Sequence, residues 1–235
     1  MTEIWSYLRQ GELLWLTATL LAYLCGDRLF RLSGRSPLVN PVLVAIVILG
    51  AALILSGTRY DTYFEGAQFV HFMLGPATVS LAVPLWANRT RVGRVMLPMG
   101  AALLVGSMVA LLSALGMGMA LGLDRTALVS LASKSVTAPV AIGITEELGG
   151  APTLTAVLVI LTGIIGAIVV TPLFNLARLT DWRARGFSAG VASHGIGTAR
   201  AFQVNETAGT FSGIGMGLNA VLTAILAPIV IRLIL

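Results

Sequence analysis

Charge is scarce in this sequence. Only 11% of its 235 residues are Asp, Glu, Lys or Arg, whereas 57% are hydrophobic, and an ordinary soluble domain carries about 25% charged residues. This balance excludes an ordinary soluble domain and indicates a membrane protein. The net charge of +5 is then explained by arginines in short loops beside membrane helices, so we expect no nucleic-acid partner.

Cysteine and histidine are also rare. The chain has one cysteine, Cys25, and two histidines. One cysteine excludes a disulfide framework, and no Cys/His cluster has zinc-ligand spacing, so we expect no metal or cofactor. The chain also lacks a GxxxxGK[ST] phosphate loop, which would be needed to couple nucleotide hydrolysis to work. It shows no Ser/His/Asp arrangement, and we therefore expect no enzymatic activity.

Long apolar runs are abundant. A hydrocarbon core of roughly 30 Å is crossed by about 20 helical residues. The clearest runs are Leu13 to Tyr23, Pro41 to Leu55, Met96 to Leu123, Pro152 to Leu176 and Ser212 to Leu235. The first has no basic flank and no small-residue cleavage site, so we expect a retained helix. The sequence predicts an all-α polytopic membrane protein in which residues 1–235 form one membrane domain.

Three weaker segments lie between the apolar runs and are rich in Gly, Ala, Ser, Thr and Pro: Gly75 to Trp86, Ser133 to Leu148 and Gly186 to Phe202. Aligned with one another, they place Thr78 over Thr137 and Glu146 over Glu206, at spacings of 59 and 60 residues. This pattern predicts a loose repeat of about 60 residues. The predicted parts are scaffold helices over 1–60 and repeat units over 61–125, 126–185 and 186–235.

Interrupted segments in repeated positions favour a transporter's binding site. A broken helix leaves backbone N–H and C=O groups that hydrocarbon cannot satisfy, so such backbone lies against protein or a wet cavity. The alternative is that the small residues only allow close helix packing.

Arginine-rich loops predict the topology. The loops over 27–35 and 88–94 carry three arginines each and are expected in the cytoplasm. The loop over 178–185 also falls in the cytoplasm if the two later small-residue segments are re-entrant and enter from opposite sides. The prediction is six crossings with two re-entrant helices, and eight plain crossings are the alternative.

Four ordered motifs resemble the LrgB/CidB family. They are "LGPATVSLAVPL" (74–85), "SKSVTAPVAIGI" (133–144), "LTGIIGA" (161–167) and "SHGIGTARAF" (193–202). The resemblance implies an integral membrane protein of the antiholin-like kind, frequently paired with a smaller LrgA/CidA-type membrane partner. A plastid glycolate/glycerate transporter of plants is similar to this family, which implies export or exchange of small organic acids.

The only lysine of the chain, Lys134, lies in one interrupted segment, while His194 and Arg200 lie in another. A buried charge in a membrane is costly and marks a functional site by default. We therefore expect a site for a small carboxylate, with hydroxyl groups and helix N-termini completing it. Its predicted substrate-binding residues are Lys134, Ser135, Thr137, Ser193, His194, Thr198, Arg200 and Thr78.

Structural explanations compete for each of these residues. Lys134 could extend to the membrane interface, Arg200 could pair with Glu206 or Glu146, and His194 could be a packing residue or a proton carrier. Gating or coupling roles are expected for His71, Glu146 and Glu206.

The cationic site favours a secondary transporter of small organic anions, and the resemblance implies glycolate-, glycerate- or pyruvate-like monocarboxylates. It would work by alternating access, with elevator-like motion in a homodimer and proton coupling, in a bacterial cytoplasmic membrane. The alternative is a holin- or antiholin-like protein that regulates murein hydrolase release and cell lysis.

Overall fold

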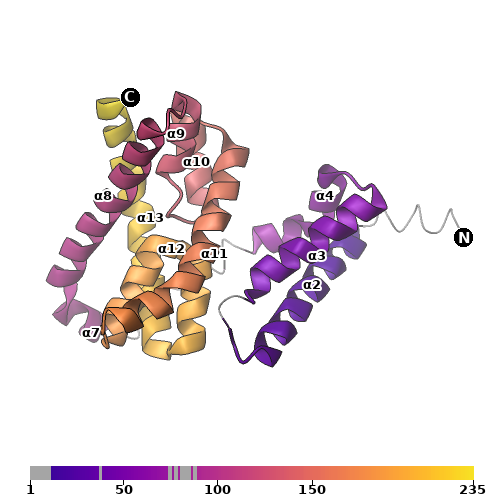
Figure 1. Cartoon of the computed structure of the whole chain (residues 1–235), viewed down its shortest axis with the longest axis horizontal. Helices are drawn as coiled ribbons and strands as arrows, with labels where there is room; N and C mark the ends of the chain where they lie inside the picture. Colours follow the sequence, from indigo (N-terminus) through magenta and orange to yellow (C-terminus); the bar gives the residue numbers. More distant parts are fainter. Residues whose placement is uncertain (1–11, 37–38, 74–75, 77–78, 80–85, 87–88) are drawn as a thin grey trace, which may run out of the picture. The chain divides into compact units, whose positions relative to one another are not determined.

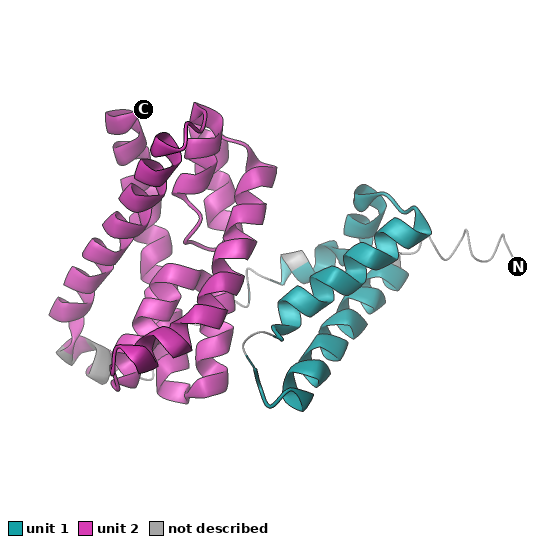
Figure 2. Ribbon diagram, in the orientation of Figure 1, with its two compact units in different colours: residues 1–82 teal, residues 83–235 magenta. Residues whose placement is uncertain are grey.

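The structure is a computed structural model and describes residues 12–36, 39–73, 76, 79, 86 and 89–235. The described residues form helices joined by turns, with no strand among them, so the predicted all-α class is confirmed. They divide into two compact units, residues 1–82 and 83–235 (Figure 2).

Unit 1 contains α2 (Glu12–Leu32), α3 (Pro41–Ser56) and α4 (Tyr60–Phe72). Helix α2 packs against both others. Asn40 begins α3 by accepting the Val42 backbone N–H at 2.8 Å, which satisfies one of the donors left free at a helix start. Trp15 of α2 and Tyr63 of α4 meet edge to face with ring centroids 5.7 Å apart.

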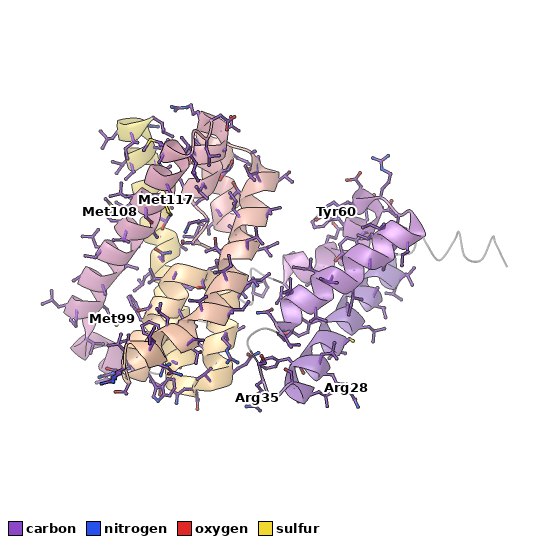
Figure 3. All side chains as sticks on the ribbon, in the orientation of Figure 1. Arg28, Arg35, Tyr60, Met99, Met108 and Met117 are labelled. Atoms are coloured by element: carbon purple, nitrogen blue, oxygen red, sulfur yellow. The ribbon has the colours of Figure 1, made fainter. Side chains whose placement is uncertain are left out.

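Helix α2 is longer than its apolar run. We expected a loop over 27–35, but α2 continues to Leu32 and includes Arg28 and Arg31. An ion pair from Arg31 to Asp27, at 2.8 Å and four residues apart, accompanies this extra helical turn. Within unit 1, Arg28 and Arg35 lie at the end opposite Tyr60 (Figure 3). Arg28 and Arg35 therefore lie at one end of this unit, whereas Arg59 directly precedes Tyr60 at the other.

Unit 2 contains the remaining described helices (Figure 1). They are α7 (Arg89–Arg94), α8 (Met96–Ala120), α9 (Arg125–Ala132), α10 (Ala138–Leu148), α11 (Pro152–Leu176), α12 (Trp182–Val204) and α13 (Glu206–Ile234). The predicted loop over 88–94 is thus helical from Arg89. The predicted loop over 178–185 is likewise helical from Trp182, where α12 begins.

Helices α9 and α10 form a hairpin. Gly149 ends α10 with φ of 77°, a left-handed conformation that glycine adopts without strain. Ser133, at the end of α9, lies 3.2 Å from Thr145 of α10. Ser130 accepts the Ala151 backbone N–H at 2.8 Å, just beyond α10. The two halves therefore run back along each other, and residues 133–137 form the turn between them.

Helix α12 is also interrupted. His194 has φ of 42° and ψ of −135°, so two helical arms meet at this residue. A small cavity is lined by Trp182 from one arm and by Val204 from the other, so the arms run back along each other. In Figure 1 the α9–α10 hairpin and α12 lie toward opposite ends of unit 2.

The first half of α13 is the centre of unit 2. Every residue from Ala208 to Met216 is buried, and Gly190 of α12 packs so closely that a Cβ there would overlap the Ser212 backbone. Among the described residues, four helices are long and apolar enough to cross a membrane: Leu13–Leu32, Met96–Ala120, Pro152–Leu176 and Glu206–Ile234. Helix α3 is apolar but shorter.

Candidate functional site

Buried hydroxyl groups hold the turn between α9 and α10. The hydroxyl oxygens of Ser133 and Thr145 are 3.2 Å apart, and the Thr145 hydroxyl lies 2.9 Å from the hydroxyl of Thr155 in α11. Thr155 in turn donates to the Ser130 carbonyl at 3.2 Å. All four residues are fully buried. Because buried polar groups are costly unless they are paired, this chain of hydrogen bonds stabilises the interruption.

Lys134 is the charged residue of this turn. Its side chain is half-buried, and Nζ donates to Ser135 Oγ at 3.2 Å. It lines a cavity of about 500 Å³ together with Ser193, which directly precedes the α12 interruption. The two interrupted segments therefore contribute to one cavity. The described residues that line it include no acidic side chain.

Most of the cavity wall is apolar. Helix α11 provides Ile165, Val169 and Leu173, while Thr162 of α11 and Ser188 of α12 add hydroxyl groups. One ammonium group in an apolar wall suits a small ligand with one negative charge, since a second charge would have to leave water without a partner.

The α12 interruption is held by hydrogen bonds to the backbone. His194 is buried, and its Nε2 lies 2.9 Å from the Val159 carbonyl of α11. A carbonyl only accepts, so this bond requires the proton on Nε2. Thr198 Oγ1 donates to the His194 carbonyl at 2.8 Å and lies 2.9 Å from Ser212 Oγ. These contacts hold His194 in a backbone conformation that costs a non-glycine residue about 1–3 kcal/mol.

Two glycines of α11 make room for this interruption. A Cβ at Gly163 would lie 2.7 Å from a ring carbon of His194, and one at Gly166 would lie 2.5 Å from Ser193 Cβ. Both contacts are shorter than the packing of carbon atoms allows. The "LTGIIGA" motif therefore lets the interrupted α12 reach α11.

The predicted site residues do not all meet. Lys134 and Ser193 share the cavity, Ser135 bonds to Lys134, and His194 lies within electrostatic range of Lys134. Thr137 begins α10. Arg200 instead lines the small cavity next to Trp182 and Arg185, a space that adjoins the larger one through the shared wall residues Val170 and Phe174.

Two of the predicted gating residues, Glu146 and Glu206, are not among the residues that line the cavity. Glu146 and Glu206 are exposed, near the end of α10 and in the first turn of α13. His71 belongs to α4 in unit 1, and its side chain lies outside the described residues, as does Thr78. The roles assigned to these residues stay predictions.

Sequence reasoning missed one residue at the centre of this region. Asn219 of α13 is buried and donates to backbone carbonyls at both interruptions. The available signal was an amide side chain in the middle of a long apolar helix, a position where polar residues are rare and functional.

Membrane-length apolar helices and a lysine beside two interrupted segments define a helical integral membrane protein with a polar centre. The chain belongs to the LrgB-like family, whose model matches residues 19–233. Thus the resemblance seen in the motifs is confirmed, and the chain is a membrane protein of the holin/antiholin family.

Relatives match over nearly the whole chain. Holin-like protein CidB of Staphylococcus aureus (strain Mu50) is 34% identical over 221 residues, covering 94% of this chain and 96% of the relative. Holin-like protein CidB of Staphylococcus epidermidis (strain RP62A) is 33% identical, covering 85% and 87%. The uncharacterized protein YxaC of Bacillus subtilis is 35% identical, covering 92% and 93%. No solved structure matches the chain.

Proposed function

We propose that this protein is a secondary transporter of small monocarboxylates of the glycolate, glycerate or pyruvate kind. The observation that carries the proposal is the cavity that is lined both by the chain's only lysine, from one interrupted segment, and by Ser193, from the other. An ammonium group with neighbouring hydroxyls supplies charge-assisted hydrogen bonds to a carboxylate. The helical halves that begin beyond each interruption add free N–H groups, which also favour an anion.

Alternating access requires the site to open toward each side of the membrane in turn. Two hairpins from opposite ends of unit 2 support this mode of action, because Lys134 of one turn and Ser193 beside the other line the same cavity. The expected elevator-like motion, proton coupling, homodimer and LrgA/CidA-type partner stay predictions, as does the bacterial cytoplasmic membrane as the location.

The same hairpins support the re-entrant topology. A re-entrant segment returns to the side from which it entered, and both α9–α10 and the arms of α12 fold back on themselves. Single cysteines over 178–185, in a Cys25→Ser protein, should then react with impermeant thiol reagents from the cytoplasmic side alone. Labelling from outside would favour eight crossings.

Transport is tested with purified protein in proteoliposomes. Vesicles loaded with unlabelled glycolate, glycerate or pyruvate should take up the labelled acid by counterflow. Lys134→Ala should abolish most of this uptake at low acid concentration. Arg28→Ala, which removes one exposed cation from unit 1, should retain it. Equal uptake by the Lys134→Ala protein would contradict the proposal.

The alternative function is a holin-like lesion, and the names of the holin-like CidB relatives favour it. A lesion passes solutes of many sizes, whereas a carrier passes only what its site binds. Vesicles that also contain a large trapped dye separate the two functions. Counterflow with the dye retained supports the transporter, and loss of dye together with acid supports the lesion.

A further inference from the structure

Asn219 joins the two interrupted segments of unit 2. It is 1% exposed, and its side-chain nitrogen donates to the Ser135 carbonyl at 3.2 Å and to the Val191 carbonyl at 3.0 Å. Its oxygen accepts from Ser107 of α8 at 2.6 Å and from Thr223, one turn along α13, at 3.2 Å. The amide nitrogen of this one side chain therefore donates to both interruptions, and its oxygen accepts from α8 and from α13.

The chemistry of these contacts determines which residue can make them. Both interruptions present carbonyl oxygens, which only accept, so the partner needs two donors on one atom. An amide provides them, whereas a hydroxyl provides one and an ionised carboxylate provides none. Ser107 and Thr223 then act as donors to the remaining oxygen. Asparagine is therefore matched to this position in a way that serine and aspartate are not.

The two carbonyls lie at positions that matter for an anion. Ser135 follows the end of α9, and Val191 is in the last turn of the first arm of α12. Every carbonyl oxygen carries partial negative charge, and the Val191 carbonyl also lies at a helix end, where that charge is larger. If they faced the cavity beside Lys134, they would repel a carboxylate and attract the ammonium group away from it.

We propose that Asn219 is a positioning residue for the anion site. It fastens the two interruptions to one point of α13 and engages the Ser135 and Val191 carbonyls, so that the cavity keeps its positive character. That Asn219 holds the two interruptions together does not depend on any function of the protein. Only its effect on the anion rests on the proposed transport function.

Hydrogen exchange of the purified full-length protein tests the fastening. Asn219→Asp keeps the shape of the side chain but cannot bond both carbonyls, because a carboxylate has no donor and a carboxylic acid has one. Amide exchange in peptides that cover 133–137 and 191–195 should accelerate at least about tenfold in this variant, as expected for lost buried hydrogen bonds. Ser107→Ala is the matched control, because it leaves both carbonyl contacts in place, and its exchange at the two interruptions should change by less than about threefold.

Two results would overturn the fastening. One is unchanged exchange at both interruptions in Asn219→Asp. The other is acceleration spread evenly through α8, α11 and α13, which would show that the substitution only loosens unit 2 as a whole.

Acid binding tests the effect on the anion site through a double-mutant cycle. Asn219→Asp and Lys134→Ala should each weaken glycolate binding by about tenfold or more. If Asn219 acts through the Lys134 site, the double variant should bind little worse than Lys134→Ala alone, whereas independent effects would multiply. Multiplying effects would overturn the positioning role.

The exchange and binding measurements distinguish the positioning role of Asn219 from the proposed transport function. Wild-type protein that binds no glycolate, glycerate or pyruvate would overturn the transport function and the positioning role together. The exchange result would still decide whether Asn219 fastens the interruptions.

Discussion

The two interruptions of unit 2 are built in different ways. Between α9 and α10 the chain leaves the helical conformation for residues 133–137, and side-chain hydroxyls hold the turn. In α12 only His194 leaves the helical conformation. That second break is held by backbone contacts and by a close approach to α11, where Gly166 leaves space for Ser193.

This difference indicates that the first interruption presents groups to a ligand, whereas the second mainly packs against α11. The longer turn has room to present Lys134 toward the cavity, and hydroxyl groups satisfy the rest of its polar surface. At the single-residue break in α12, His194 and Thr198 form hydrogen bonds with nearby backbone and side chains. These groups are therefore engaged in holding the structure and offer little to a ligand. Variants of Lys134 should therefore affect ligand binding, whereas variants that disturb the contact between α11 and the α12 interruption should affect folding.

The largest effect is expected at the tight α11–α12 contact. Gly166→Ala would force Ser193 and the α12 interruption away from α11, because the new Cβ would lie 2.5 Å from Ser193 Cβ. Overpacking of this kind costs about 1–3 kcal/mol or more, although alanine alone would favour the helix. Thermal unfolding in detergent should shift down clearly. Gly116→Ala in α8, which has open space, should be neutral or stabilising, and equal shifts in both variants would contradict the packing argument.

Removal of the cavity's positive charge should change binding without harming the fold. A charge-assisted hydrogen bond contributes about 1.5–3 kcal/mol, so Lys134→Ala should weaken monocarboxylate binding by about tenfold to over a hundredfold. Lys134→Arg should restore it only in part, because the planar guanidinium does not replace a compact ammonium group. Titration calorimetry measures the affinity. A loss of thermal stability as large as that of Gly166→Ala would show that Lys134 is structural.

Hydroxyl groups at the first interruption should contribute to stability more moderately. Thr145→Val keeps the shape of a buried side chain but removes its bonds to Ser133 and Thr155. The unpaired partners should cost about 1–3 kcal/mol, measured by thermal unfolding. Thr153→Val, at an exposed position near the start of α11, is the control. Similar stability of the two variants would mean that the hydroxyl chain does not hold the turn.

The smallest effect is expected at the start of α12, outside the cavity. Asp181 accepts the Arg183 backbone N–H at 2.9 Å, and hydrogen bonds from the Arg183 side chain and backbone hold the pKa of Asp181 below its ordinary value of 3.8. Asp181→Ala should cost about 0.5–1 kcal/mol near neutral pH.

The pH dependence at Asp181 has a definite sign. A lowered pKa means that the stabilisation is present above pH 3.8 and is lost as the pH falls through the folded-state value. Asp181→Asn keeps the cap without the charge, so its stability should not show this acid-dependent loss. An identical acid profile in wild type and Asp181→Asn would contradict the assignment.

Much of the helical architecture was predictable from local patterns. The apolar runs begin and end near the observed helices α3, α8 and α11, and the segments rich in Ser, Gly and Pro mark both described interruptions. Helix ends were less predictable where charge is present: α2 runs through Arg28, because an ion pair and neighbouring turns outweigh the tendency of charged residues to lie in loops.

By itself the sequence determined the membrane class and the family, because apolar length and motif order are properties of the chain alone. It also singled out Lys134 as a candidate, because this residue is the only lysine of the chain. The tertiary structure decided which groups meet. Arg200 lines the small cavity beside Trp182 and not the larger cavity that Lys134 lines. Asn219 is far from both interruptions along the chain but donates hydrogen bonds to a carbonyl at each. Such contacts between distant residues depend on how far each helix arm folds back and on how closely glycines let the backbones approach. No local sequence pattern specifies either.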